Sequence, residues 1–116
     1  MSNKRVENFV YFKSMHTEVY KAYEAYGKVV HEQGGPIEEK SRWLIKVAIS
    51  AAGQHEFSLR SHIHKALNAG CTRNEVEHAI LLIAPTSGFP TAMEAIMILR
   101  DELDQEVNEE EINKPR

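Results

Sequence analysis

The chain has 116 residues, of which 42% are apolar and 27% charged, and its formal net charge is −3. This length suits one domain, and the slightly acidic balance argues against nucleic-acid binding. A membrane-spanning helix needs a run of about 18 apolar residues, which we do not find. The segment Met1–Val10 has no apolar stretch of signal-peptide length. We therefore predict a soluble, cytoplasmic protein without a nucleic-acid or membrane partner.

A single cysteine, Cys71, is present. One cysteine can form neither an internal disulfide nor a Cys-x-x-Cys redox pair. Dithiol chemistry within one chain is therefore excluded. Because Cys71 follows a predicted helix end, we interpret it as a small, semi-buried structural residue.

The first half of the chain predicts two helices. An apolar and aromatic stripe with steps of three and four residues predicts one helix from about Val6 to Glu32, ended by Gly34, Gly35 and Pro36. Pro36 is expected to open the second helix at its first position, and Gly53 to end it. The second helix has one broad apolar face, formed by Trp43, Leu44, Val47, Ala48 and Ala51.

The second half predicts three further helices. The third runs from about His55 to Ala69, with Gly70 as a left-handed C-cap. The fourth begins with a capping box formed by Thr72 and Glu75, and Pro85 should kink or end it. The turn 86–90 then leads into a fifth helix that reaches about Leu103.

No segment has the alternation of a β-strand, so we predict an all-α, single-domain bundle of about five helices. Residues 1–35 would form an N-terminal helix in the core or an interface, and 36–103 the folded core. Residues 104–116 would form an acidic, frayed tail.

The most informative stretch contains His55, Ser58 and His62. On a helix these positions share one face over two turns. Two imidazoles beside a hydroxyl could exchange protons near neutral pH. The alternative is a solvated polar stripe with a capping histidine. We do not predict a metal site, because the two histidines are seven residues apart, unlike the paired ligands of His-Glu-x-x-His.

Two segments of the chain carry a family resemblance. The first is residues 58–75, which contain the run Ala66-Leu-Asn-Ala-Gly70 and the cap at Thr72. The second is residues 88–95, which begin Gly88-Phe-Pro-Thr-Ala. Over about residues 36–103 the chain resembles the carboxymuconolactone decarboxylase family, which has the alkyl-hydroperoxidase-D-like fold. The shared turns and caps specify the fold better than the reaction.

In the alkyl hydroperoxidase D branch, the resemblance places the two redox cysteines at His55 and Ser58, the histidine at His62 and the glutamate at Trp43. Only His62 matches. A serine oxygen cannot replace a sulfur that must form a disulfide. Peroxidase activity of the peroxiredoxin type is therefore disfavoured.

The decarboxylase branch needs no thiol and no cofactor. The resemblance thus implies a lyase that removes carbon dioxide from a small carboxylated lactone or a related acid. His62 would be the central acid or base, with His55 and Ser58 beside it. Arg60 could pair with a substrate carboxylate, and Trp43 could line the substrate site. Arg60 could equally be solvated, and Trp43 could belong to the core or an interface.

Two further expectations follow from the resemblance. Family members assemble as trimers or hexamers, so we expect a homo-oligomer in which the first helix lies at the interface. The loss of the cysteines and of the glutamate would also suit a non-catalytic binding module that retained only the fold.

Overall fold

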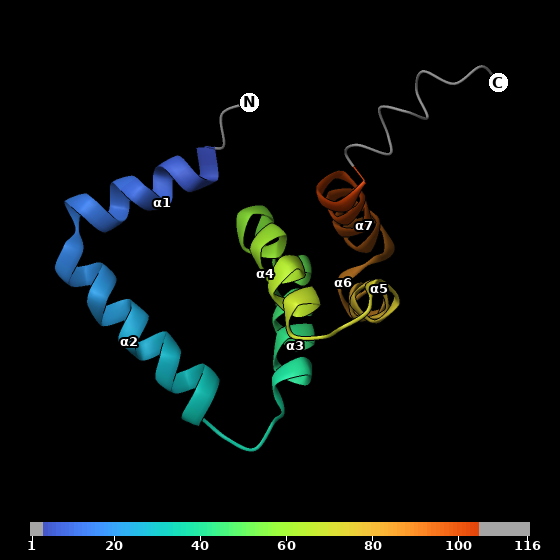
Figure 1. Cartoon of the computed structure of the whole chain (residues 1–116). Helices are drawn as coiled ribbons and strands as arrows, with labels where there is room; N and C mark the ends of the chain where they lie inside the picture. The colour runs from blue at the N-terminus through green and yellow to red at the C-terminus, as the bar shows by residue number, and fades with distance from the viewer. Residues whose placement is uncertain (1–3, 105–116) are drawn as a thin grey trace. The chain divides into compact units, whose positions relative to one another are not determined.

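The computed structural model of the protein describes residues 4–104, and every secondary-structure element within that range is a helix, which confirms the all-α prediction (Figure 1). The chain divides into two compact units, Met1–Ile37 and Glu38–Arg116. Apart from Asp104, the predicted acidic tail lies outside the described residues. None of the described helices is long and apolar enough to cross a membrane.

The first unit contains two helices, α1 (Lys4–Met15) and α2 (Thr17–Gln33), where the sequence predicted one. The break lies at His16, whose φ of −129° and ψ of 53° are not helical. The hydroxyls of Ser14 and Thr17 donate to backbone carbonyls three and four residues earlier. Such hydrogen bonds compete with the backbone hydrogen bonds of a helix and often bend it. The helix therefore breaks here although the apolar stripe continues across His16.

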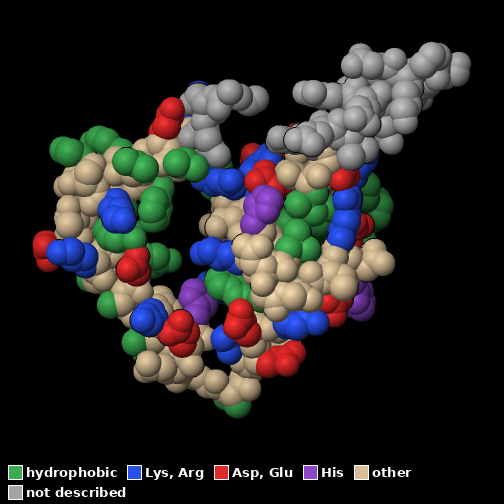
Figure 2. Space-filling view, in the orientation of Figure 1, with side chains coloured by type: hydrophobic (Ala, Val, Ile, Leu, Met, Phe, Trp, Pro, Cys, Tyr) green, Lys and Arg blue, Asp and Glu red, His purple; other side chains and the backbone are tan. Residues whose placement is uncertain are grey.

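Neither α1 nor α2 has a buried residue. Figure 2 shows apolar side chains on the surface of this unit. The exposed apolar residues include Phe9, Val10, Tyr11, Met15, Val19, Tyr23, Tyr26 and Val29.

The second unit contains five helices: α3 (Glu39–Ala52), α4 (Glu56–Asn68), α5 (Arg73–Leu81), α6 (Ala84–Ser87) and α7 (Phe89–Leu103). Helix α3 packs against α4, α5 and α7, and α4 packs against α7. The largest fully buried side chains of this core are Val47, Leu59, Ile63, Val76, Ile80 and Leu99. Leu59 and Ile63 on α4, and Val76 and Ile80 on α5, are each four residues apart, which places each pair on one face of its helix.

The local signals at the helix ends were largely correct. Thr72 and Glu75 form the predicted capping box at the start of α5, and Gly70 has the left-handed φ of +101°. Pro36 was wrongly expected at the first position of α3, because the backbone at Glu38 is still extended. Helix α5 ends before Pro85, which instead lies in the first turn of the short helix α6.

Candidate functional site

His62 lies half-buried on α4 and faces α3. Its Nδ1 is 2.8 Å from the hydroxyl oxygen of Ser50 and 3.3 Å from the backbone carbonyl oxygen of Lys46. Ser50 is only 2% exposed, and it is the one polar residue among the buried residues of the described chain. A buried hydroxyl needs a hydrogen-bond partner, and the imidazole provides one. Ser50 and Lys46 therefore fix the orientation of the His62 ring.

The indole of Trp43 is an aromatic neighbour of His62. The two ring centroids are 5.7 Å apart and the planes are tilted by 47°. Trp43 lies about one turn before Lys46 on α3. The same helix therefore supplies all three groups around the imidazole: the Trp43 indole, the Lys46 carbonyl and the Ser50 hydroxyl. The structure thus places the predicted substrate-binding residue Trp43 beside the predicted catalytic residue His62.

Two lysine ammonium groups lie over the Trp43 ring. Lys46 Nζ is 5.8 Å from the ring centroid and Lys65 Nζ, from α4, is 5.2 Å from it. Burial, and then repulsion by Lys65, lower the pKa of Lys46. These distances fall within the range of cation–π attraction. Trp43, His62, Ser50, Lys46 and Lys65 together form what we call the Trp43–His62 cluster.

His55 and Ser58 are exposed, and Ser58 lies one helical turn before His62 on α4. His55 precedes α4 as its N-cap residue, with non-helical φ and ψ of −90° and 83°. The expected face shared by His55 and His62 assumed helical geometry at both positions, and this geometry is absent at His55. Their proposed catalytic roles remain predictions.

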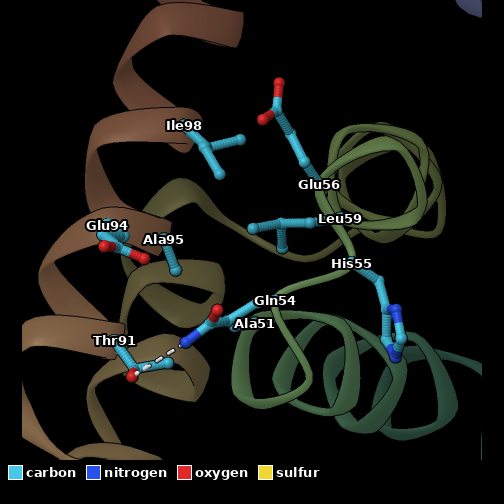
Figure 3. Close-up of a pocket in the computed structure, with 9 residues that line it drawn as sticks. All are labelled: Ala51, Gln54, His55, Glu56, Leu59, Thr91, Glu94, Ala95 and Ile98. Carbon is cyan, nitrogen blue, oxygen red and sulfur yellow. Dashed lines mark hydrogen bonds between the residues drawn. The ribbon is translucent and has the colours of Figure 1, made fainter.

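His55 instead lines a separate pocket between the loop after α3 and helix α7, with a cavity volume of about 170 Å³. Neither Ser58 nor His62 lines this pocket. Its wall includes Gln54, whose side-chain amide donates to the Thr91 hydroxyl at 3.4 Å (Figure 3). The His55 imidazole points away from that pair and lies against Gly53, where an added Cβ would approach the ring to 2.6 Å.

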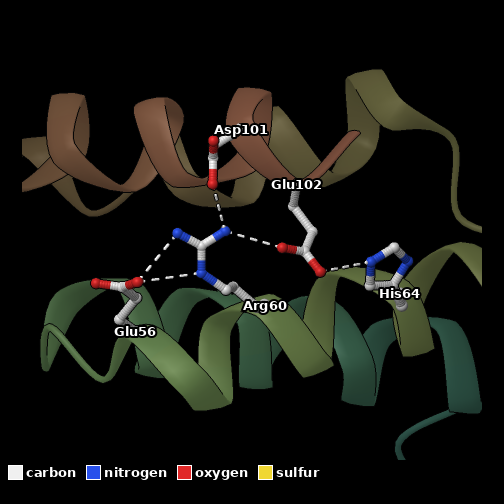
Figure 4. Close-up of polar contacts among 5 residues, drawn as sticks. All are labelled: Glu56, Arg60, His64, Asp101 and Glu102. Atoms are coloured by element: carbon white, nitrogen blue, oxygen red, sulfur yellow. Dashed lines mark hydrogen bonds and ion pairs between the residues drawn. The ribbon is translucent and has the colours of Figure 1, made fainter. Parts of the chain in front are cut away.

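Arg60, the other predicted substrate-binding residue, is part of an ion-pair network between α4 and α7 (Figure 4). Its guanidinium lies 2.8 Å from both Asp101 and Glu102 and 3.0 Å from Glu56. Glu102 also pairs with His64 at 3.0 Å. Burial disfavours the charge of Arg60, but hydrogen bonds with Glu102, Asp101 and Glu56 outweigh it and raise the pKa. A substrate carboxylate would have to displace one of these three acids.

Sequence reasoning missed Ser50, Lys46 and Lys65. For Ser50 a signal existed, because a serine between Val47 and Ala51 on a predicted apolar face must find a buried partner. The two lysines gave no such signal, since lysines on helices are usually solvated. No group of three or more metal-binding side chains is assembled within residues 4–104.

Comparison with known proteins places the chain in a family. The model of the carboxymuconolactone decarboxylase family matches residues 17–101. The match begins at the first residue of α2 and so extends beyond the predicted stretch from residue 36. No curated protein matches the chain.

Proposed function

The chain belongs to the carboxymuconolactone decarboxylase family, and we propose that it is a cofactor-free lyase acting on a small carboxylated lactone or a related acid. The observation that carries the proposal is the orientation of the His62 imidazole by Ser50 at 2.8 Å. His62 is also the one residue that the resemblance gives the same identity as in the family's catalytic motif.

The partners of Nδ1 define how His62 would act. The carbonyl of Lys46 can only accept a hydrogen bond, and the Ser50 oxygen can also accept one. Both contacts therefore favour a proton on Nδ1. A second proton, on Nε2, would then be the one exchanged with the substrate.

The reaction would proceed by loss of carbon dioxide followed by protonation. The carbon–carbon bond to the carboxylate breaks, carbon dioxide leaves, and the electron pair is delocalised toward the lactone carbonyl. Nε2 of the His62 imidazolium donates its proton to the resulting carbanion. The neutral imidazole keeps its Nδ1 proton toward Ser50 and regains the other proton from water.

The experiment is a decarboxylation assay on γ-carboxymuconolactone that follows the loss of substrate absorbance. The wild type is compared with His62→Ala and with His78→Ala, a matched control because His78 is an exposed histidine on α5. We expect turnover in the wild type and in the control, and its loss in His62→Ala. Equal turnover in all three proteins would refute the role of His62.

A homo-oligomer accompanies this proposal. The support is the exposed apolar surface of α1 and α2, which bury no side chain. Uncovered apolar patches of this kind mark interaction sites. Light scattering coupled to size-exclusion chromatography should give a mass above that of one chain, and Tyr23→Glu together with Tyr26→Glu should lower it. A monomeric wild type would contradict the assembly but leave the lyase proposal intact.

A second candidate is a non-catalytic binding module on the same fold. The observation in its favour is that His55 and Ser58, which stand where the resemblance places the redox cysteines, are both exposed. In that case, the assay would show no turnover with this lactone or with related carboxylated lactones.

A further inference from the structure

The Trp43 indole is flanked by two cations from different helices. Lys46 comes from α3 and Lys65 from α4, and both ammonium groups lie within 6 Å of the ring centroid at 5.8 and 5.2 Å. His62, from α4, contacts the same ring system. Three groups that can carry positive charge therefore surround one aromatic side chain.

These two lysines differ from most other cationic side chains of the second unit in their lack of an ion pair with the described acids. Arg60, Arg73 and Lys40 each form an ion pair with at least one carboxylate. Within the described residues, neither Lys46 nor Lys65 forms one. Placing two like charges in the same neighbourhood is unfavourable, and the partial burial of Lys46 adds to this. An anion bound between them would relieve both effects.

We infer that Lys46 and Lys65 bind the carboxylates of an organic dianion whose apolar part rests against the Trp43 indole beside His62. This inference rests on the proposed function, and it names the residues that hold the substrate. It transfers substrate binding from Arg60, which already binds three carboxylates, to a pair of lysines that form no ion pair with the acids of residues 4–104.

The arrangement suits a dicarboxylate better than a monocarboxylate. Two ammonium groups on separate helices can each take one carboxylate, whereas a single carboxylate leaves one cation unneutralised. The indole offers an apolar surface for the carbon skeleton between them. A substrate held there would lie next to the imidazole that is to protonate it.

Trp43 is the one tryptophan of the chain, so intrinsic fluorescence reports on this cluster directly. The experiment titrates the full chain with glutarate at low salt, following tryptophan emission and, in parallel, the heat of binding by calorimetry. Butyrate serves as the monocarboxylate comparison. The variants are Lys46→Met and Lys65→Met, with Arg100→Met as control because Arg100 is an exposed cation on α7.

We expect saturable binding of glutarate that is stronger than binding of butyrate. Lys46→Met should weaken it by roughly tenfold, since a partly desolvated charged hydrogen bond is lost. Because Lys65 is more exposed, Lys65→Met should weaken glutarate binding by only about threefold to fivefold. Arg100→Met should change the affinity for glutarate little. Lys65→Arg should retain most of the affinity because it keeps the charge.

The outcomes separate this inference from the proposed function. Absence of heat and of emission change with glutarate, or equal affinity in all variants, overturns the lysine site even if His62-dependent turnover is found. Lysine-dependent binding without turnover of this or related carboxylated lactones supports the dianion site and overturns the lyase proposal. Circular dichroism of each variant ensures that a lost signal does not come from unfolding.

Discussion

The hydroxyl of Ser50 lies 2.8 Å from Nδ1 of His62, and this contact joins α3 to α4 inside the folded core. Ser50 is 2% exposed, so water cannot easily replace the imidazole as the partner of its hydroxyl. The contact fixes an imidazole that would otherwise rotate about its side-chain bonds. It also makes Ser50 a positioning residue, because it acts on substrate only through His62.

Replacing Ser50 by alanine should lower both stability and turnover. The imidazole loses one of its Nδ1 partners, and the free energy of unfolding should fall by about 1 kcal/mol. Urea denaturation measures this loss, and the ¹⁵N shifts of the His62 ring should show a change in tautomer preference that simple destabilisation would not cause. Ser58→Ala, at an exposed position, should change the free energy of unfolding by less than about 0.5 kcal/mol. Unchanged ring shifts in Ser50→Ala would argue against the positioning role.

Arg60 should matter for stability more than for substrate binding. Its guanidinium is 18% exposed and connects α4 to Asp101 and Glu102 of α7. Arg60→Gln should reduce the free energy of unfolding by roughly 1–3 kcal/mol, because several charged hydrogen bonds are lost. Arg60→Lys should recover only part of this, since an ammonium cannot reproduce the fork geometry. If Arg60→Gln unfolds at the wild-type urea concentration but shows a raised KM, Arg60 binds substrate after all.

Asp104 should give a pH-dependent contribution to stability. Hydrogen bonds from Arg73, at 2.6 and 2.9 Å, hold the pKa of this carboxyl below its ordinary value. A depressed folded-state pKa stabilises the fold above the unfolded-state pKa, and the contribution disappears as the pH falls through the folded-state value. Asp104→Asn should therefore melt below the wild type at pH 7. The two melting temperatures should converge in acid, and a constant difference across the whole range would contradict the assignment.

Cys71 should be inert, and the protein should lack thiol peroxidase activity. The side chain is 5% exposed and its Sγ lies 3.6 Å from the carbonyl oxygen of Lys40. Burial raises the pKa of the thiol, which disfavours the reactive thiolate. A thiol reagent should label the native chain slowly and the urea-unfolded chain rapidly. A peroxidase assay with a dithiol donor should match the no-protein control, and a rate that Cys71→Ala abolishes would contradict this prediction.

Local features of the fold were predictable from sequence because they depend on neighbouring residues. The capping box needs only Thr72 and Glu75, and the left-handed turn needs only Gly70. The break at His16 was not predictable, because the apolar stripe continues across it while hydroxyls from Ser14 and Thr17 bind the backbone.

The candidate site was predictable only in part. His62 and Trp43 were identified from the resemblance, and the structure brings them together. The contacts of His62 with Ser50 and of Trp43 with Lys65 join α3 to α4, so they depend on how these two helices pack. Helical spacing alone therefore grouped His62 with His55 and Ser58, whereas tertiary packing directs it toward α3.

The most direct test of proton transfer by His62 compares the turnover number on γ-carboxymuconolactone of wild type and His62→Ala, each with and without added imidazole. We expect the turnover number of the variant to fall by roughly 10²–10⁴-fold, the usual contribution of general acid catalysis, and imidazole to restore part of the rate in the variant alone. Wild-type turnover in His62→Ala without imidazole would contradict proton transfer by His62.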